Sequence, residues 1–277
     1  MTAHSVDLVT VSIVLYKNDD EVLKTIQCVL DTPMDIRLFL IDNSPTDIFR
    51  SRLQNVLHNQ RVTYIHNQSN IGFGAAHNIA IRKIIETSKY HLVLNPDVLF
   101  EPYVIANLVE YMEKKPEVGL VLPKVVYPSG KIQYVCRLIP SPTDLILKRF
   151  IPFKWIKKRM DKYRMIFTGY NREMEVPYFI GCFMFLRVEA LKNVGLFDER
   201  FFMYPEDIDL TRRMHQQYKT MFYPFVQIIH VHEQGSYKNI KLFYIHITNM
   251  IKYFNKWGWF FDKERKEVNR KILSQFN

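Results

Sequence analysis

Short apolar segments that alternate with segments of helical spacing constrain the fold of this chain more than any other feature. The strand-like runs lie at residues 9–16, 36–41, 62–65, 91–94 and 118–122. Helix-like runs, with apolar residues three or four positions apart, lie between them at residues 19–30, 48–57, 74–87 and 102–114. The strands are almost wholly apolar, as in a parallel sheet covered on both faces. The first half is therefore predicted to be an α/β unit with a mostly parallel sheet flanked by helices.

The pattern changes after about Val125. Residues 127–131 predict a turn, which we interpret as part of a hairpin. Further extended runs lie at residues 176–186 and 220–229. Helical periods lie at residues 188–194, 208–218 and 237–256. The chain therefore continues as a less regular second half that ends in helices.

The bulk properties are those of a globular protein with an anionic partner. The chain has 277 residues, of which 48% are hydrophobic, so it can bury a sizeable core. Its three cysteines are far apart and indicate free thiols in a reducing compartment. We expect no signal peptide and no membrane span. The formal net charge of +10 leaves nucleic acid, an anionic membrane surface and an anionic substrate as alternative partners.

Polar groups follow several of the predicted strands. Asn95-Pro96-Asp97 comes directly after the apolar run 91–94. A carboxylate there lies at the carboxyl edge of the sheet, where open α/β sheets bind ligands, and can hold a divalent cation. By itself the tripeptide is more often only a turn. Asp42 ends the second strand. A ligand-binding role and a purely structural Asx turn are about equally favoured for it.

Residues 70–78 open a helix after the third strand and include Gly72 and Gly74. Two glycines allow the backbone to approach a ligand, and a helix N-terminus favours negative charge. The spacing is not that of a dinucleotide fingerprint. The alternative is a structural loop, with Asn78 as a solvated helix residue.

Three carboxylates, Glu206, Asp207 and Asp209, gather at a predicted helix start after the aromatic residues 201–204. Acids are common at helix N-termini because they favour the helix dipole. The aromatic residues would partly desolvate them, which raises a carboxyl pKa and suits a general base. Their spacing places Asp207 and Asp209 on different faces of the helix, so the two need not share one task.

His230 and His232 end another extended run, on one face of the strand if the strand reaches that far. Such a pair can bind metal, although strand histidines are more often structural.

Two stretches interleave aromatic residues with cations, at residues 147–164 and 253–261. This composition is typical of helices at a membrane interface. The alternative is a solvated basic face whose apolar residues lie in the core. No pattern of a nucleic-acid-binding module accompanies them, so we expect no nucleic acid partner.

Taken together, these motifs resemble family 2 glycosyltransferases of GT-A fold. The resemblance rests on Val11-Ser12-Ile13-Val14 with Tyr16, on Asp42-Asn43-Ser44, on residues 70–78, on Asn95-Pro96-Asp97 and on residues 204–210. It covers about Val9 to Trp259 and is strongest to bacterial rhamnosyltransferases of O-antigen and cell-wall assembly. It implies a GT-A domain, with a Rossmann-like sheet, over residues 1–236. A nucleotide-sugar half would span 1–124, an acceptor half 125–236, and a basic, membrane-associating helical extension 237–277.

The resemblance also implies roles for single residues on the donor side of the site. Asp42, with Tyr16 nearby, corresponds to the acid that binds the pyrimidine of the donor nucleotide. Asn70, Gly72 and Asn78 correspond to the loop that borders the nucleotide and the sugar.

Asn95 and Asp97 occupy the place of the metal-binding Asp-x-Asp motif, with the first acid replaced by an amide. That replacement leaves less charge for a Mg²⁺ or Mn²⁺ ion. The resemblance assigns the general base to Asp207 or Glu206, with Asp207 favoured, and a metal contact to His232 rather than to His230.

The implied reaction is inverting transfer from a nucleotide-diphosphate sugar, dTDP-β-L-rhamnose in particular, to a sugar on a polyprenyl diphosphate. The implied location is peripheral, on the cytoplasmic face of a bacterial inner membrane. Another donor, such as UDP-galactofuranose or another deoxysugar, is an alternative. A non-catalytic nucleic-acid-binding protein would leave the acidic cluster without a task. A nucleotidyltransferase would need a glycine-rich, basic loop after the first strand, which residues 14–18 lack.

Overall fold

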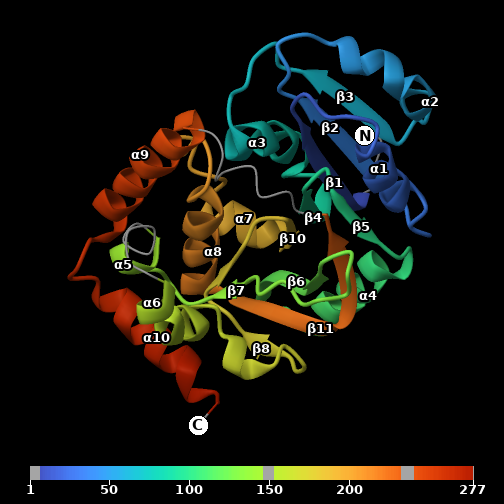
Figure 1. Cartoon of the computed structure of the whole chain (residues 1–277). Helices are drawn as coiled ribbons and strands as arrows, with labels where there is room; N and C mark the ends of the chain where they lie inside the picture. Colours follow the sequence, from blue (N-terminus) through green and yellow to red (C-terminus); the bar gives the residue numbers. More distant parts are fainter. Residues whose placement is uncertain (1–6, 146–152, 232–239, 277) are drawn as a thin grey trace.

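A computed structural model describes residues 7–145, 153–231 and 240–276 (Figure 1). Within these residues, nine strands form one sheet in the order β3–β2–β1–β4–β10–β6–β11–β5, with β8 paired to β11. The strands are β1 (Asp7–Leu15), β2 (Ile36–Asp42), β3 (Val62–His66), β4 (Ser88–Leu94), β5 (Val98–Phe100), β6 (Val118–Val126), β8 (Met174–Glu175), β10 (Phe183–Arg187) and β11 (Lys219–His230). A small second sheet pairs β7 (Cys136–Arg137) with β9 (Tyr178–Phe179).

The part of the sheet formed by the first four strands is parallel, as predicted, whereas the sheet as a whole is mixed. Strands β1, β2, β3 and β4 pair in parallel, and so do β6 and β11. Strand β10 lies antiparallel between β4 and β6, while β5 and β8 run antiparallel to β11. The register pairs Leu15 with Asp42, and Leu94 with both Ile13 and Phe183. The loops that follow β1, β2 and β4 therefore leave the sheet at one edge.

Helices cover both faces of the sheet (Figure 1). Those of the first half are α1 (Val22–Leu30), α2 (Gln54–Leu57), α3 (Phe73–Ile84) and α4 (Tyr103–Glu113), with a 3₁₀ helix η1 (Ile48–Leu53) before α2. Those of the second half are α5 (Pro142–Leu145), α6 (Phe153–Tyr163), η3 (Ile166–Thr168), α7 (Val188–Val194), α8 (Glu206–Gln217), α9 (Ile240–Trp257) and α10 (Lys263–Ser274). One cluster of buried apolar side chains extends from Val9 to Ile272, so the predicted halves and the C-terminal helices share one core.

One local prediction needs correction. The run 176–186 is not one continuous strand, because β9 ends at Phe179, β10 begins at Phe183, and Gly181 between them lies against the Asp207 side chain. A Cβ at Gly181 would lie 3.0 Å from that of Asp207.

The predicted hairpin around residues 127–131 is present as a short one. Tyr127 N donates to Lys131 O at 2.8 Å, and Gln133 N donates to Val125 O at 2.9 Å. Between these bonds, Val126 and Ile132 form an antiparallel bridge.

The two aromatic, basic stretches place most of their described apolar side chains in the core. On α6, Ile156 and Met160 are buried, while Trp155 is 83% exposed. In the second stretch, Tyr253 and Phe254 are buried and the aromatic pair 260–261 is exposed. Residues 147–152 of the first stretch lie outside the described part. Of the helices described, none is long and apolar enough to cross a membrane.

A buried ion cluster attaches α8 to the C-terminal helices. Arg212 of α8 is 1% exposed and donates to both carboxylate oxygens of Asp262 at 2.8 Å. It also donates to Glu264 at 2.7 Å, and its guanidinium lies 4.1 Å from the centre of the Trp257 ring. A buried charge is costly unless it is paired with an opposite charge and hydrogen-bonded. This pairing therefore fixes α8 against α9 and α10.

We predict that Arg212→Met lowers the free energy of unfolding by roughly 3–5 kcal/mol, because it leaves the buried Asp262 carboxylate without its partner. Urea denaturation followed by circular dichroism measures the change. Arg270→Met is the matched control, since Arg270 is an exposed arginine of α10. Equal midpoints for the two variants would show that the cluster adds nothing to stability.

Candidate active site

A cavity of about 490 Å³ lies at the carboxyl edge of the parallel strands. Its wall includes five polar or aromatic residues that follow strand ends: Tyr16, Asn43, Asn70, Asn95 and Asp97. Four of the five were predicted from the sequence as site residues, and Asn43 was not. The strand ends bring them together because the register aligns β1, β2 and β4 at this edge. Met203, from the loop before α8, closes the cavity on another side.

The turn at Asn95-Pro96-Asp97 is held from three directions. Asn95 N donates to Cys182 O at 3.0 Å, and Val231 N donates to Asp97 O at 2.9 Å. The hydroxyl of Thr25, on α1, donates to Pro96 O at 2.8 Å. These bonds leave the side chains of Asn95 and Asp97 on the cavity wall, as the sequence predicted. The turn is thus rigid at the point where a ligand would contact it.

His230 is the histidine that the structure brings to this turn. Its Nε2 lies 3.4 Å from Asp97 Oδ1 and 3.5 Å from Asn95 Nδ2, and its Nδ1 lies 3.0 Å from Gln133 Oε1. Burial opposes its charge, but Cys182 and Asp97 outweigh burial and raise the pKa of His230 to about 10. His232, which we favoured, lies outside the described residues, so its role stays a prediction.

The turn offers donors that suit a hard cation. Asn95 and Asp97 present an amide and a carboxylate oxygen at the cavity, which is the chemistry that Mg²⁺ and Mn²⁺ prefer. No group of three His, Cys, Asp or Glu side chains arranged for a metal occurs in the described ranges. The residues fit a cation that takes several of its ligands from water and substrate phosphates, as Mg²⁺ commonly does.

Asp42 lies behind the cavity wall and is fully buried. Its Oδ1 accepts from Ser44 N at 2.8 Å, which is an Asx turn, and its Oδ2 accepts from the Tyr64 hydroxyl at 2.6 Å. Its neighbour Asn43 faces the cavity instead. The structural interpretation of Asp42 is therefore observed, and its role in binding the nucleotide base stays a prediction.

The two glycines at the start of α3, Gly72 before the helix and Gly74 in its first turn, pack closely against protein, and the ligand contact expected of this loop stays a prediction. Gly72 has φ +95°, and a Cβ there would lie 2.5 Å from Phe202 O. At Gly74 a Cβ would lie 2.8 Å from that of Phe197. The start of α3 is thus packed against the loop that precedes α8, and Phe73 N donates to Phe202 O at 3.1 Å.

Asn78 stabilises the same contact and is not a solvated residue. It is buried, its Nδ2 donates to Phe197 O at 2.9 Å and to Glu199 at 2.8 Å, and its Oδ1 accepts from Phe197 N at 3.1 Å. Its side chain is thereby fully occupied within the protein. The predicted place of Asn78 in the loop that borders the nucleotide and the sugar stays a prediction.

Glu206 and Asp207 begin α8 as a buried acid pair. Burial raises the pKa of Asp207 to about 7, although the backbone N–H groups of Gly181 (2.9 Å) and Ile208 (2.7 Å) and the charge of Arg137 oppose the rise. Burial, together with the charge of Asp207, raises the pKa of Glu206 well above its usual value. The predicted desolvation is observed, and a base with a pKa near 7 suits proton abstraction.

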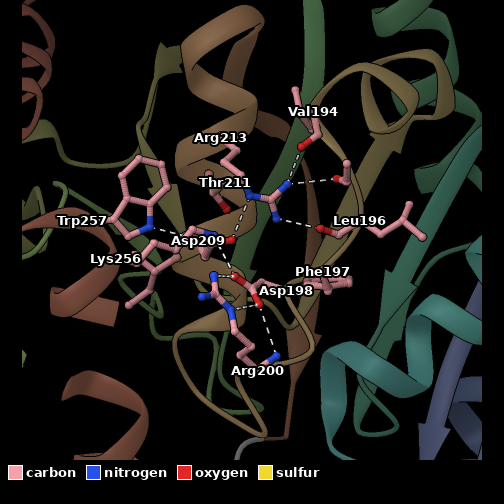
Figure 2. Close-up of polar contacts among 12 residues, drawn as sticks. Val194, Leu196, Phe197, Asp198, Arg200, Asp209, Thr211, Arg213, Lys256 and Trp257 are labelled. Atoms are coloured by element: carbon pink, nitrogen blue, oxygen red, sulfur yellow. Dashed lines mark hydrogen bonds and ion pairs between the residues drawn. The ribbon is translucent and has the colours of Figure 1, made fainter. Parts of the chain in front are cut away.

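Asp209 has a different, structural task, as its position on the helix predicted. Figure 2 shows it between Arg213 on one side and Trp257 with Lys256 on the other. Its Oδ2 accepts from Arg213 Nε at 2.9 Å, and its Oδ1 accepts from Trp257 Nε1 at 2.8 Å and pairs with Lys256 at 2.6 Å. This carboxylate therefore links α8 to the end of α9.

The partners of Asp209 extend to the loop before α8 (Figure 2). Arg213 donates to the carbonyl oxygens of Val194, Gly195 and Leu196 at 2.6–3.1 Å. Lys256 also bonds Asp198 at 2.8 Å. That loop then reaches Tyr204, whose φ of +92° is unusual for a residue with a side chain. The acid pair thus begins directly after a backbone held under strain.

Arg137 is a site residue that our sequence interpretation missed. It lies half-buried on β7, its guanidinium lies 5.6 Å from the centre of the Tyr163 ring, and its charge lowers the pKa of Asp207. Its hydrogen bonds go to the backbone carbonyls of Tyr134 and Cys136. No motif marks this arginine, because its nearness to α8 depends on the pairing of β7 with β9.

Comparison with known proteins agrees with this geometry. The sequence model described as glycosyl transferase family 2 matches residues 10–195, which is more than half of the chain. The chain belongs to glycosyl transferase family 2. This family 2 protein is 26% identical over 217 residues to the N-acetylglucosaminyl-diphospho-decaprenol L-rhamnosyltransferase of Mycobacterium tuberculosis, covering 73% of this chain and 68% of that protein. It is 25% identical over 255 residues to the rhamnosyltransferase WbbL of Escherichia coli K12, covering 89% and 92%.

A solved structure described as GalNAc-T7 with UDP, GalNAc and Mn²⁺ has the same fold as this glycosyltransferase. The TM-score is 0.65 at 16% identity, over 90% of this chain. This chain spans about half of that structure, 48% of its length. The predicted GT-A fold and glycosyltransferase activity are confirmed.

We predict that the catalytic rate of this glycosyltransferase rises with pH through an apparent pKa near 7, because Asp207 accepts a proton only when it is ionised. Arg137→Gln should move this limb to higher pH, since the arginine charge favours the ionised carboxylate. The measurement is kcat/KM against pH for both proteins. If the limb does not move in Arg137→Gln, the ionisation of Asp207 does not control the rate.

Proposed function

We propose that this protein transfers L-rhamnose from dTDP-β-L-rhamnose to a sugar carried on a polyprenyl diphosphate, with inversion at the anomeric carbon. The observation that carries the proposal is the buried Asp207, whose pKa is near 7. Asp207 lies at the start of α8, and Met203 in the loop before that helix lines the strand-edge cavity. Two relatives named as rhamnosyltransferases, one of them acting on a diphospho-decaprenol substrate by its name, support the choice of sugar and acceptor.

The reaction needs one proton transfer and one displacement. Asp207 takes the proton of the acceptor hydroxyl, whose oxygen attacks the anomeric carbon from the face opposite the leaving group. The new C–O bond forms as the bond to the nucleotide diphosphate breaks, so a single displacement inverts the configuration. The bonds from Gly181 N and Ile208 N aim the Asp207 carboxylate.

The cavity wall would receive the donor. Tyr16, Asn43 and Asn70 line the part of the cavity next to β1 and β2, and Asn95 with Asp97 line the part next to β4. The latter two would hold a Mg²⁺ or Mn²⁺ ion, with His230 beside them. When bound, such an ion supplies positive charge to the departing diphosphate.

We predict that the purified protein transfers rhamnose from dTDP-rhamnose to a polyprenyl-diphosphate-linked N-acetylglucosamine and uses UDP-galactofuranose or other nucleotide sugars poorly. Asp207→Asn should reduce transfer by roughly 10²–10⁴, the usual contribution of a general base, with donor affinity nearly unchanged. Mass spectrometry of the product gives the answer. Preferred use of another donor would contradict the proposed sugar, and near-normal turnover of the variant would move the base to Glu206.

We further predict that Asp97→Ala removes metal-dependent binding of dTDP. Calorimetry with dTDP in the presence and absence of Mn²⁺ measures this, and Asn95→Asp should strengthen the metal dependence because it adds a charged ligand. Asp19→Ala is the matched control, since Asp19 also lines the cavity but lies outside the turn. Unchanged affinity in Asp97→Ala would leave the turn with a structural role only.

We propose a peripheral location on the cytoplasmic face of the inner membrane. The net charge of +10 supports it, together with exposed aromatic side chains at Trp155, Phe260 and Phe261. Lysines and arginines near an anionic surface contribute about 1 kcal/mol each, and exposed aromatic rings favour the interface. Sedimentation with anionic vesicles at low and high salt tests this location, because salt screens such attraction.

A further inference from the structure

A second, larger hollow lies between α6 and α10, which run side by side in Figure 1. This groove has a volume of about 1350 Å³ and belongs to the second half of the chain, away from the strand-edge cavity. The apolar part of its lining includes Leu138, Ile166, Phe167 and Leu273. Phe167 is 52% exposed, so apolar surface is open to an occupant there.

Cations without acidic partners surround this apolar lining. They are Lys157, Lys158, Lys162, Lys266 and Arg270. Among the described residues none of the five forms an ion pair, whereas Arg159 in the same groove is bound to Asp144 at 2.7 Å. Asp161 is a further acid in the lining. The groove therefore combines hydrocarbon contact with an excess of uncompensated positive charge.

The groove is adjacent to the proposed base. Tyr163 ends α6 and lines the groove, and the guanidinium of Arg137 lies 5.6 Å from the centre of its ring. The next residue, Leu138, also lines the groove and donates its N–H to Tyr163 O at 3.0 Å. Arg137 in turn acts electrostatically on Asp207. The groove thus reaches β7, which pairs with β9, and β9 packs against α8 where Gly181 contacts Asp207.

We propose that this groove binds the polyprenyl-diphosphate part of the acceptor, with the phosphates among the cations and the start of the prenyl chain on the apolar lining. The proposal rests on the proposed function and assigns the lipid end of that substrate. An occupant with a hydrocarbon chain next to two phosphates matches both features of the groove. A bulk anionic membrane needs only the charge, and it needs no hollow.

The test reverses three groove charges, with Lys158→Glu, Lys162→Glu and Arg270→Glu in one protein. The control is Lys154→Glu, Lys263→Glu and Lys271→Glu, which changes exposed residues of the same two helices outside the groove by the same net charge. Binding of decaprenyl diphosphate in detergent micelles is measured for each protein. Three cations near phosphate contribute roughly a hundredfold in affinity, so the groove variant should weaken binding by about that factor.

Kinetics separate this inference from the proposed function. The groove variant should have a higher KM for the lipid-linked acceptor. The reference is the KM for a water-soluble acceptor that lacks lipid and diphosphate, measured with the same variant. The proposal would be overturned if the control variant lost as much affinity for decaprenyl diphosphate as the groove variant. It would also be overturned if the groove variant lost binding to anionic vesicles that contain no diphosphate lipid. Either result would mean general attraction to a charged surface. Wild-type binding of decaprenyl diphosphate through the groove without rhamnose transfer would instead reject the proposed donor.

Discussion

The position of helix α8 depends on charged side chains that the fold buries and pairs. Asp209 and Arg212, which are almost fully buried, lie on this helix and bind groups from α9 and α10. Arg213, the partner of Asp209, donates to the carbonyl oxygens of residues 194–196. An unpaired buried charge costs several kcal/mol, so these pairings are satisfied together or the helix shifts. The geometry of the acid pair at the start of α8 therefore depends on these pairings. One helix thus carries both the acid pair and the buried ion pairs that hold it in place.

This dependence changes the meaning of the C-terminal helices. The family match ends at residue 195, before α8, α9 and α10 begin. Nevertheless Asp262, Trp257 and Lys256 complete the pairing of α8, and Asn249 donates to Met203 O, at the cavity, at 3.0 Å. A segment that the sequence describes as an appended extension is therefore part of the support of the active site. A role at a membrane would come in addition to this support.

The sequence predicted groups whose position follows from local rules. Asn95 and Asp97 could be placed because a strand end determines the edge of the sheet. The aromatic residues before Asp207 predicted its desolvation, and burial does raise the pKa of Asp207. The protein contacts of a residue could not be predicted when its partner is distant in sequence. Gly72 and Asn78 pack against Phe202 and Phe197, which lie more than a hundred residues away, and their roles toward a ligand stay predictions. Arg137 emerged only from strand pairing, and the contact of the candidate His230 with Asp97 became visible only in the fold, for the same reason.

The two acids at the start of α8 can be distinguished by their surroundings. Asp207 accepts two backbone N–H bonds, which favour its ionised form and fix its direction. Glu206 is buried too, yet its Oε2 has no hydrogen-bond partner within the described residues. Two adjacent buried carboxyls resist being charged together, so the proton stays on the one with weaker support. Glu206 is thus the acid that stays neutral, and its proton keeps the pair singly charged, as the proposed role of Asp207 as the base requires.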